Sequence, residues 1–173
     1  MPAPVSPDRL HGLLLGTAVG DALGLPAEGL RPAGIARLGW AHPWRHRFLG
    51  RRGMWSDDTE HTIMLEQAVL AADGDPERFR RSLAHQLRWW LLGLPSGVGL
   101  ATLRATVRLW LGISPQRAGV FSAGNGPCMR AALIGLCFPD GADRRAFTET
   151  QATLTHRDPR AVTAAWAVAE LAA

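Results

Sequence analysis

Apolar residues recur at intervals of three and four along almost the whole chain, which is the spacing of one face of an α-helix. This pattern predicts helices over about 10–21, 57–72, 76–92, 100–111, 127–136 and 142–153, and from 159 onward. No stretch alternates convincingly with a period of two, and there is no internal repeat or low-complexity tract. The predicted fold class is therefore all-α.

The first predicted helix combines an apolar face with a glycine repeat. The face expected to pack inward carries Leu10, Leu13, Leu14, Thr17, Ala18 and Asp21. Asp8, behind Pro7, is available as the cap of this helix. Gly12, Gly16 and Gly20 recur every four residues. Because glycine costs helix stability, we expect these glycines to let a neighbouring helix come close.

The clearest start and stop signals flank residues 76–92. Asp75 is a favourable N-cap, Pro76 suits the first turn, and Gly93 ends the pattern. The side chains of this helix expected to be buried are Phe79, Leu83, Leu87, Trp90 and Leu91. Those expected to point inward from the next helix are Leu103, Val107 and Trp110. Residues 111–127 carry turn chemistry without a period and are predicted to form a long loop.

Composition adds limits on size, class and compartment. The 173 residues fit one domain, 1–173, and the 47% apolar and 20% charged content is typical of globular proteins rather than disordered ones. Cys128 and Cys137 cannot make a disulfide framework and lack metal-like spacing, so a cytoplasmic location is expected. No run reaches the roughly 18–20 apolar residues of a membrane span, so we expect a soluble protein without a membrane partner.

An acid-free segment, residues 29–56, separates the first two helices. Its basic residues are Arg31, Arg37, His42, Arg45, His46, Arg47, Arg51 and Arg52. One interpretation is a solvated connector, and the other is a basic lip that attracts a phosphorylated or otherwise anionic substrate. The basic residues occupy one loop and lack aromatic-platform spacing or a DNA-binding motif, which argues against nucleic acid as a partner.

Two adjacent carboxylates, Asp57 and Asp58, stand in the stretch "WSDDTEHT" at the start of a predicted helix. In a structural interpretation Ser56 or Asp57 caps the helix, and Glu60 completes a capping box. In a chemical interpretation a hard divalent cation removes the repulsion between the carboxylates. Hydroxyl and carboxylate oxygens favour Mg²⁺ or Mn²⁺ over Zn²⁺. Three such oxygens fill only half an octahedron, so a second ligand group must come from elsewhere.

Four blocks in the chain occur in a characteristic order: "GLLLGTAVGDALGLPAE", "WSDDTEHT", "SAGNGPCMRAALIG" and "THRDP". Together they resemble the ADP-ribosylglycohydrolase family, and the resemblance covers nearly the whole chain. It implies an all-α bundle with a binuclear Mg²⁺ or Mn²⁺ centre. It also implies a hydrolase that removes ADP-ribose from a modified protein or small molecule by cleaving the glycosidic bond.

The resemblance assigns roles to individual residues. Ser56, Asp57 and Asp58 match the first group of metal ligands, and Glu28 matches an acid beside the substrate ribose that serves in catalysis or gating. The structural alternative for Glu28 is an exposed loop acid. The residues expected to hold the ligand-bearing helix in place are Thr59, His61 and Thr62. Asp21 is expected to brace the loop after the first helix by bonding backbone N–H groups.

The phosphate and ribose contacts are implied in the same way. Gly124, Asn125 and Gly126 match the loop that lines the ADP-ribose phosphates and ribose. Exposed backbone N–H groups ahead of a helix suit an anion. His156 matches a histidine near the ribose and the metal centre. The alternatives are simple turn chemistry for the glycines and a structural role for the histidine.

One part of the family pattern is missing from the sequence. Family members usually continue to a C-terminal D-T-D-T-like segment with the remaining metal ligands, whereas the only acid here after Asp158 is Glu170. The 173-residue chain is therefore expected to be an incomplete hydrolase: a truncated product, one part of a split enzyme completed by a C-terminal half on another chain, or a degenerate member. Exposed apolar faces would then favour self-association. The alternative function is a non-catalytic helical module that binds ADP-ribose or a protein partner.

Overall fold

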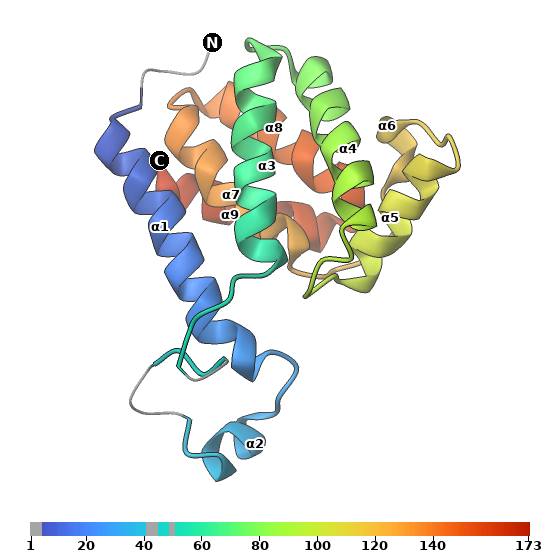
Figure 1. Cartoon of the computed structure of the whole chain (residues 1–173). Coiled ribbons are helices and arrows are strands. Elements are labelled where there is room, and N and C mark those ends of the chain that lie inside the picture. The colour runs from blue at the N-terminus through green and yellow to red at the C-terminus, as the bar shows by residue number, and fades with distance from the viewer. Residues whose placement is uncertain (1–4, 41–44, 49–50) are drawn as a thin grey trace.

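The computed structural model describes residues 5–40, 45–48 and 51–173, and helices make up most of these ranges (Figure 1). The helices are α1 (Pro7–Gly24), α2 (Pro32–Arg37), α3 (Asp57–Ala72), α4 (Pro76–Leu92), α5 (Leu100–Trp110), α6 (Pro115–Ala118), α7 (Gly126–Cys137), α8 (Gly141–Thr155) and α9 (Pro159–Ala172), with a 3₁₀ turn, η1 (Leu25–Ala27), after α1. Within the described ranges the only β-type pairs are isolated bridges, so the predicted all-α class is confirmed.

Aspartate side chains cap the N-termini of three helices. Asp75 accepts a hydrogen bond from the Glu77 N–H at 2.8 Å at the start of α4, and Asp158 accepts one from the Arg160 N–H at 2.9 Å at the start of α9. Asp140 does the same for α8. Each cap pairs a donor that the helix itself leaves unbonded. The starts predicted at 75 and 158 are confirmed.

The hydrophobic core lies between α3, α4, α7, α8 and α9. Phe147 of α8 is its aromatic centre, with the Phe79 ring centroid 5.1 Å away and the Phe138 ring stacked at 4.1 Å. The backbones of α7 and α9 approach closely at Gly135, where a Cβ would collide with the Ala169 carbonyl oxygen. Only glycine permits this crossing.

Helix α1 lies along the side of the bundle and contributes little to the core (Figure 1). The predicted inward face is at least half-buried along its length, but the expected close helix contact at Gly12, Gly16 and Gly20 is wrong for the described residues. A Cβ at any of these glycines would meet nothing within 4 Å. The predicted cap is also wrong: Ser6 holds the N-cap position without a side-chain bond, and Asp8 lies inside the first turn.

The span Pro7–Ala27 is long and apolar enough to cross a membrane, judged by length and composition only. Its mean hydropathy is 1.2, and 11% of it is buried. This is weak evidence, because core helices of soluble proteins and signal sequences have the same properties. Asp21 interrupts the apolar run within this span, which is why no membrane span was predicted from the sequence.

Helix α5 faces the opposite way from the prediction. The residues expected inside, Leu103, Val107 and Trp110, are 37%, 42% and 44% exposed. The buried face instead carries the smaller side chains Ala101, Thr102, Ala105 and Thr106, together with Leu109. Both faces have helical spacing, and the small side chains let α5 lie closer to the bundle.

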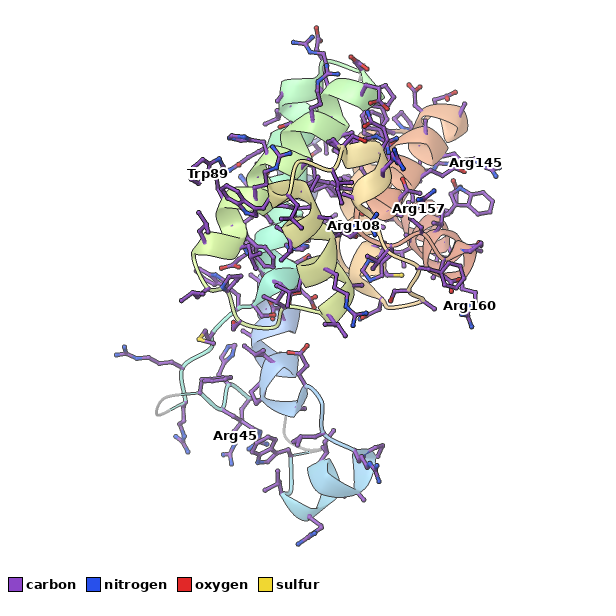
Figure 2. All side chains as sticks on the ribbon, turned by 90° about the vertical axis from the view of Figure 1, so that its right-hand side faces the viewer. Arg45, Trp89, Arg108, Arg145, Arg157 and Arg160 are labelled. Atoms are coloured by element: carbon purple, nitrogen blue, oxygen red, sulfur yellow. The ribbon has the colours of Figure 1, made fainter. Side chains whose placement is uncertain are left out.

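Two predicted loops contain short helices. Helix α6 interrupts the loop predicted at 111–127, and α2 lies in the basic segment 29–56. Figures 1 and 2 show the basic segment projecting away from the bundle, with Arg45 on the projection. Phe48 and Arg52 form a small antiparallel bridge there. His42 lies outside the described residues.

Two glycine substitutions test this packing. Gly135→Ala should destabilise the fold by more than about 2 kcal/mol, because the new methyl group meets backbone that cannot move aside. Gly12→Ala, on the exposed face of α1, should raise stability by about 0.5–1 kcal/mol. Urea denaturation of both variants measures the difference. Equal effects of the two substitutions would contradict the close α7–α9 contact.

Candidate functional site

A cavity of about 500 Å³ opens where the end of α1 meets the N-terminal ends of α3 and α7. This is the lower end of α3 in Figure 1. The predicted site residues that line the cavity are Glu28, Ser56, Asp57, Asp58, Gly124, Asn125, Gly126 and His156. Segments far apart in sequence are therefore brought to one place.

Asp21 of α1 holds the first turn of α3 in place. Its carboxylate accepts hydrogen bonds from the Ser56 N–H at 2.7 Å and the Ser56 hydroxyl at 2.8 Å. It also accepts from the Thr59 N–H at 3.2 Å and the Thr59 hydroxyl at 2.6 Å. Asp21 therefore bonds backbone N–H groups, as expected, but those of α3 rather than those of the loop after α1.

The capping box, which was the structural interpretation of this helix start, does not form. Ser56 occupies the N-cap position without a side-chain cap bond, and Glu60 accepts instead from the Trp90 indole N–H at 2.6 Å. Because Asp21 caps α3 from another helix, the carboxylates of Asp57 and Asp58 are not needed for capping and both line the cavity.

Burial and like charges act together on these two carboxylates. Burial, with Asp58 and then Glu28 nearby, raises the pKa of Asp57 from 3.8 to about 7. Burial, with Asp21 and Glu28, also raises the pKa of Asp58. Carboxylates this close together resist ionisation because their negative charges repel, and a bound cation would relieve that repulsion.

The donor set fits one part of a site for a hard divalent cation. Ser56 donates its hydroxyl proton to Asp21, which leaves the oxygen lone pairs available, and Asp57 and Asp58 add carboxylate oxygens beside it. Within the described part of the chain, no group of three or more His, Cys, Asp or Glu is arranged to hold a metal ion. Glu170 lies elsewhere, paired with Arg144 at 2.7 Å.

Gly124 and Gly126 pack against the ring of His156 on the cavity wall. A Cβ at Gly124 would lie 3.0 Å from His156 Nε2, and one at Gly126 would lie 2.8 Å from Cε1. His156 is buried, and burial followed by the charge of Arg130 lowers the pKa of its ring to about 4. The ring is therefore neutral at physiological pH.

Two features of this site were not predicted from the sequence. Gly97 and residues 99–102 line the cavity, and Gly97, at φ 81°, contacts the Asp57 carboxylate so closely that a Cβ would overlap it. Arg130 of α7 lies fully buried and binds His61, Gln151 and Thr155. Its signal in the sequence is a charged residue among the apolar residues of "CMRAALIGL".

Three anchors predicted for α3 are present in the structure. Thr59 bonds Asp21, the Thr62 hydroxyl donates to the Asp58 carbonyl at 2.8 Å, and His61 lies 2.7 Å from Arg130. All three anchoring side chains are buried. The carboxylate-bearing turn is thus supported from α1, α3 and α7.

The fold and the site define an all-α protein with a cluster of acids facing a glycine-rich turn. A sequence model of the ADP-ribosylglycohydrolase family matches residues 2–173, and the chain belongs to this family. It is 33% identical over 170 residues to the ADP-ribosyl-[dinitrogen reductase] glycohydrolase of Rhodospirillum rubrum, which covers 92% of this chain and 55% of that protein.

Two further relatives support the same family. An uncharacterized protein of Archaeoglobus fulgidus is 35% identical over 167 residues, covering 94% of this chain and 54% of that protein. A solved structure described as an ADP-ribosylglycohydrolase-related protein complex has a TM-score of 0.70 and 31% identity, covering 95% of this chain and 54% of the other. The chain therefore spans about half the length of these relatives.

The raised pKa of Asp57 predicts how stability depends on pH without metal. The folded chain binds this proton more tightly than the unfolded chain, so stability should fall as pH rises from about 4 through about 7. At about pH 8, the free energy of unfolding of Asp57→Asn should exceed that of the wild type by on the order of 1–3 kcal/mol. At about pH 4 the two free energies should agree. Urea denaturation with a chelator present measures this.

The matched control is Asp73→Asn at the exposed, opposite end of α3. It should follow the wild-type pH dependence. Parallel curves for Asp57→Asn and the wild type would show that Asp57 ionises normally in the folded chain.

Proposed function

We propose that this chain carries the acidic and phosphate-binding walls of a hydrolase that releases ADP-ribose from a modified acceptor by cleaving its glycosidic bond. The observation that carries the proposal is one cavity with Asp57, Asp58 and Glu28 on its acidic side and Gly124–Gly126 with neutral His156 on the other. Family membership supports the same chemistry. Because the chain spans half the length of its relatives, activity of the whole enzyme is part of the proposal.

Ser56, Asp57 and Asp58 would hold one Mg²⁺ or Mn²⁺ of a binuclear centre. Their oxygens are the ligand types that these cations prefer, and the raised pKa values of both carboxyls support the proposal, since a cation would relieve their repulsion. When bound, the metal supplies charge that orients the ribose hydroxyls and a water molecule. The chain offers no second ligand group of the expected type among its described residues.

The other residues bind and position the substrate. Backbone N–H groups at Gly124–Gly126, at the start of α7, would receive the diphosphate, since a helix N-terminus favours negative charge. Glu28 follows η1 at the cavity edge and would take a proton from, or orient, a hydroxyl near the anomeric carbon.

We propose a modified protein as the acceptor. The name of the Rhodospirillum rubrum relative gives dinitrogen reductase as its own substrate. A protein acceptor suits a cavity whose lining includes Glu28 and Ser56, at the two ends of the projecting basic segment. The arginines of that segment would attract an acidic acceptor surface.

The alternative is a module that binds ADP-ribose or a partner without hydrolysing anything. It is favoured by the incomplete ligand set in the described residues. In either case a C-terminal half on another chain, or self-association, would supply further surface. Hydrolysis and binding must therefore be measured separately.

The function is tested by the double substitution Asp57→Asn with Asp58→Asn. Calorimetry should show Mn²⁺ binding by the wild type and at least a tenfold weaker affinity in the double variant, because two charged ligands are lost. Asp73→Asn is the control and should bind as the wild type. Release of ADP-ribose from Arg-linked and Ser-linked substrates, assayed in parallel, separates the hydrolase from the binding module.

If the double variant keeps its metal affinity, the metal binds at residues other than Asp57 and Asp58. Metal-dependent ADP-ribose binding without release would favour the non-catalytic module.

Neutralising Arg51 and Arg52 tests the basic segment. Both side chains are exposed, so Gln at both positions should slow association with an ADP-ribosylated protein several-fold at low salt, with little difference at high salt. Stopped-flow fluorescence measures the rate. The control is Gln at Arg78 and Arg81, exposed on α4, which changes net charge equally. Equal slowing in both variants would leave net charge, not the segment, as the cause.

A further inference from the structure

Arg130 is a fully buried cation whose hydrogen bonds go to neutral groups. Its Nε donates to Gln151 Oε1 at 2.6 Å, and one terminal nitrogen donates to the Gln151 carbonyl and to Thr155 Oγ1, both at 3.0 Å. The other terminal nitrogen lies 2.7 Å from His61 Nδ1. Because a guanidinium can only donate, the direction of each bond is fixed.

This fixed direction determines the hydrogen position on Thr155. The Thr155 oxygen accepts from Arg130, so its own hydroxyl proton needs another acceptor. In the described part of the chain, His156 Nδ1, at 2.9 Å, is the partner within reach. If the hydroxyl donates to Nδ1, the neutral ring must carry its hydrogen on Nε2.

The protonated nitrogen would then face the cavity. Nε2 of His156 lies beside Gly124, 3.0 Å from where a Cβ would be, and His156 lines the cavity wall. A second side chain depends on Arg130 in the same way. His61 Nδ1 accepts from the guanidinium, so this ring is also neutral and carries its hydrogen on Nε2.

We propose that Arg130 is a positioning residue which, through the Thr155 hydroxyl, holds His156 as a hydrogen-bond donor toward the cavity. His156 then recognises an acceptor oxygen of a nucleoside diphosphate sugar and does not take a proton from it. The identity of that ligand rests on the proposed function, whereas the order of the hydrogen bonds does not. Burial and the charge of Arg130 both keep the ring neutral, in agreement with this arrangement.

A competing arrangement has the opposite consequence. If the Thr155 oxygen accepted from both Arg130 and His156 Nδ1–H, Nε2 would present a lone pair to the cavity and could act as a base. The two arrangements share the same heavy-atom positions. They differ only in which nitrogen of the ring is protonated, and this can be measured.

The test is two-dimensional ¹H–¹⁵N spectroscopy of the histidine rings in the whole chain without ligand, with the His156 signals assigned by His156→Gln. The wild type should show His156 protonated at Nε2. Thr155→Ser keeps the hydroxyl and should preserve that state. Thr155→Val keeps the shape without the hydroxyl and should give a mixture of tautomers, and Arg130→Lys should do the same because it cannot serve all of these acceptors.

Circular dichroism identifies variants that fail to fold. If Arg130→Lys does not fold, the comparison of Thr155→Ser with Thr155→Val still tests the proposal. A wild-type ring protonated at Nδ1, or an unchanged tautomer in folded Thr155→Val, would overturn the relay. Calorimetry with ADP-ribose adds a second readout: Thr155→Val should bind up to about tenfold more weakly, and Thr155→Ser normally. Absence of ADP-ribose binding in the wild type would refute the proposed ligand, and the spectra would still decide the relay.

Discussion

The four hydrogen bonds accepted by Asp21 are the constraint on which the site depends. They join the end of α1 to the first turn of α3 across 35 residues of sequence. A carboxylate that receives two N–H and two O–H groups is well satisfied even when buried. Because the capping task is done by α1, Asp57 and Asp58 can line a cavity at the cost of mutual repulsion, which the rest of the fold must balance.

Part of that balance comes from Arg130 of α7, which contacts α3 at His61, one turn after Asp57. Burial lowers the pKa of Arg130 to about 10, while the nearby charge of Asp57 acts in the other direction. Arg130 therefore stays protonated at neutral pH and offsets the acidic cluster without a direct ion pair. Burial, and then the same cation, disfavour protonation of His61 and His156. The buried charge of Arg130 therefore acts on both walls of the cavity: it offsets the acids, and it adds to the effect of burial in keeping the two histidine rings neutral.

Local features of the fold were predictable from sequence, and distant ones were not. Asp75 and Asp158 cap helices two residues away, so their motifs are complete in a short stretch. The cap of α3 lies on another helix, and no local pattern distinguishes it from the capping box that was expected. On α5 two faces share helical spacing, and packing selected the smaller side chains. The family resemblance located the cavity residues. The role of Arg130 could not be predicted, because its hydrogen-bond partners lie on two other helices, α3 and α8.

The hydrogen bonds that join Asp21, which precedes the basic segment, to Ser56, its last residue, have an evolutionary consequence. Asp21 and Ser56 stay within hydrogen-bond distance whatever the chain between them does, and α2 and Arg45 extend away from the bundle (Figure 2). Doubling the length of a loop with fixed ends costs only about 0.6 kcal/mol of closure entropy. Insertions and deletions there would leave the carboxylates in place, so the surface of this segment can diverge between lineages while the acidic wall of the cavity keeps its geometry.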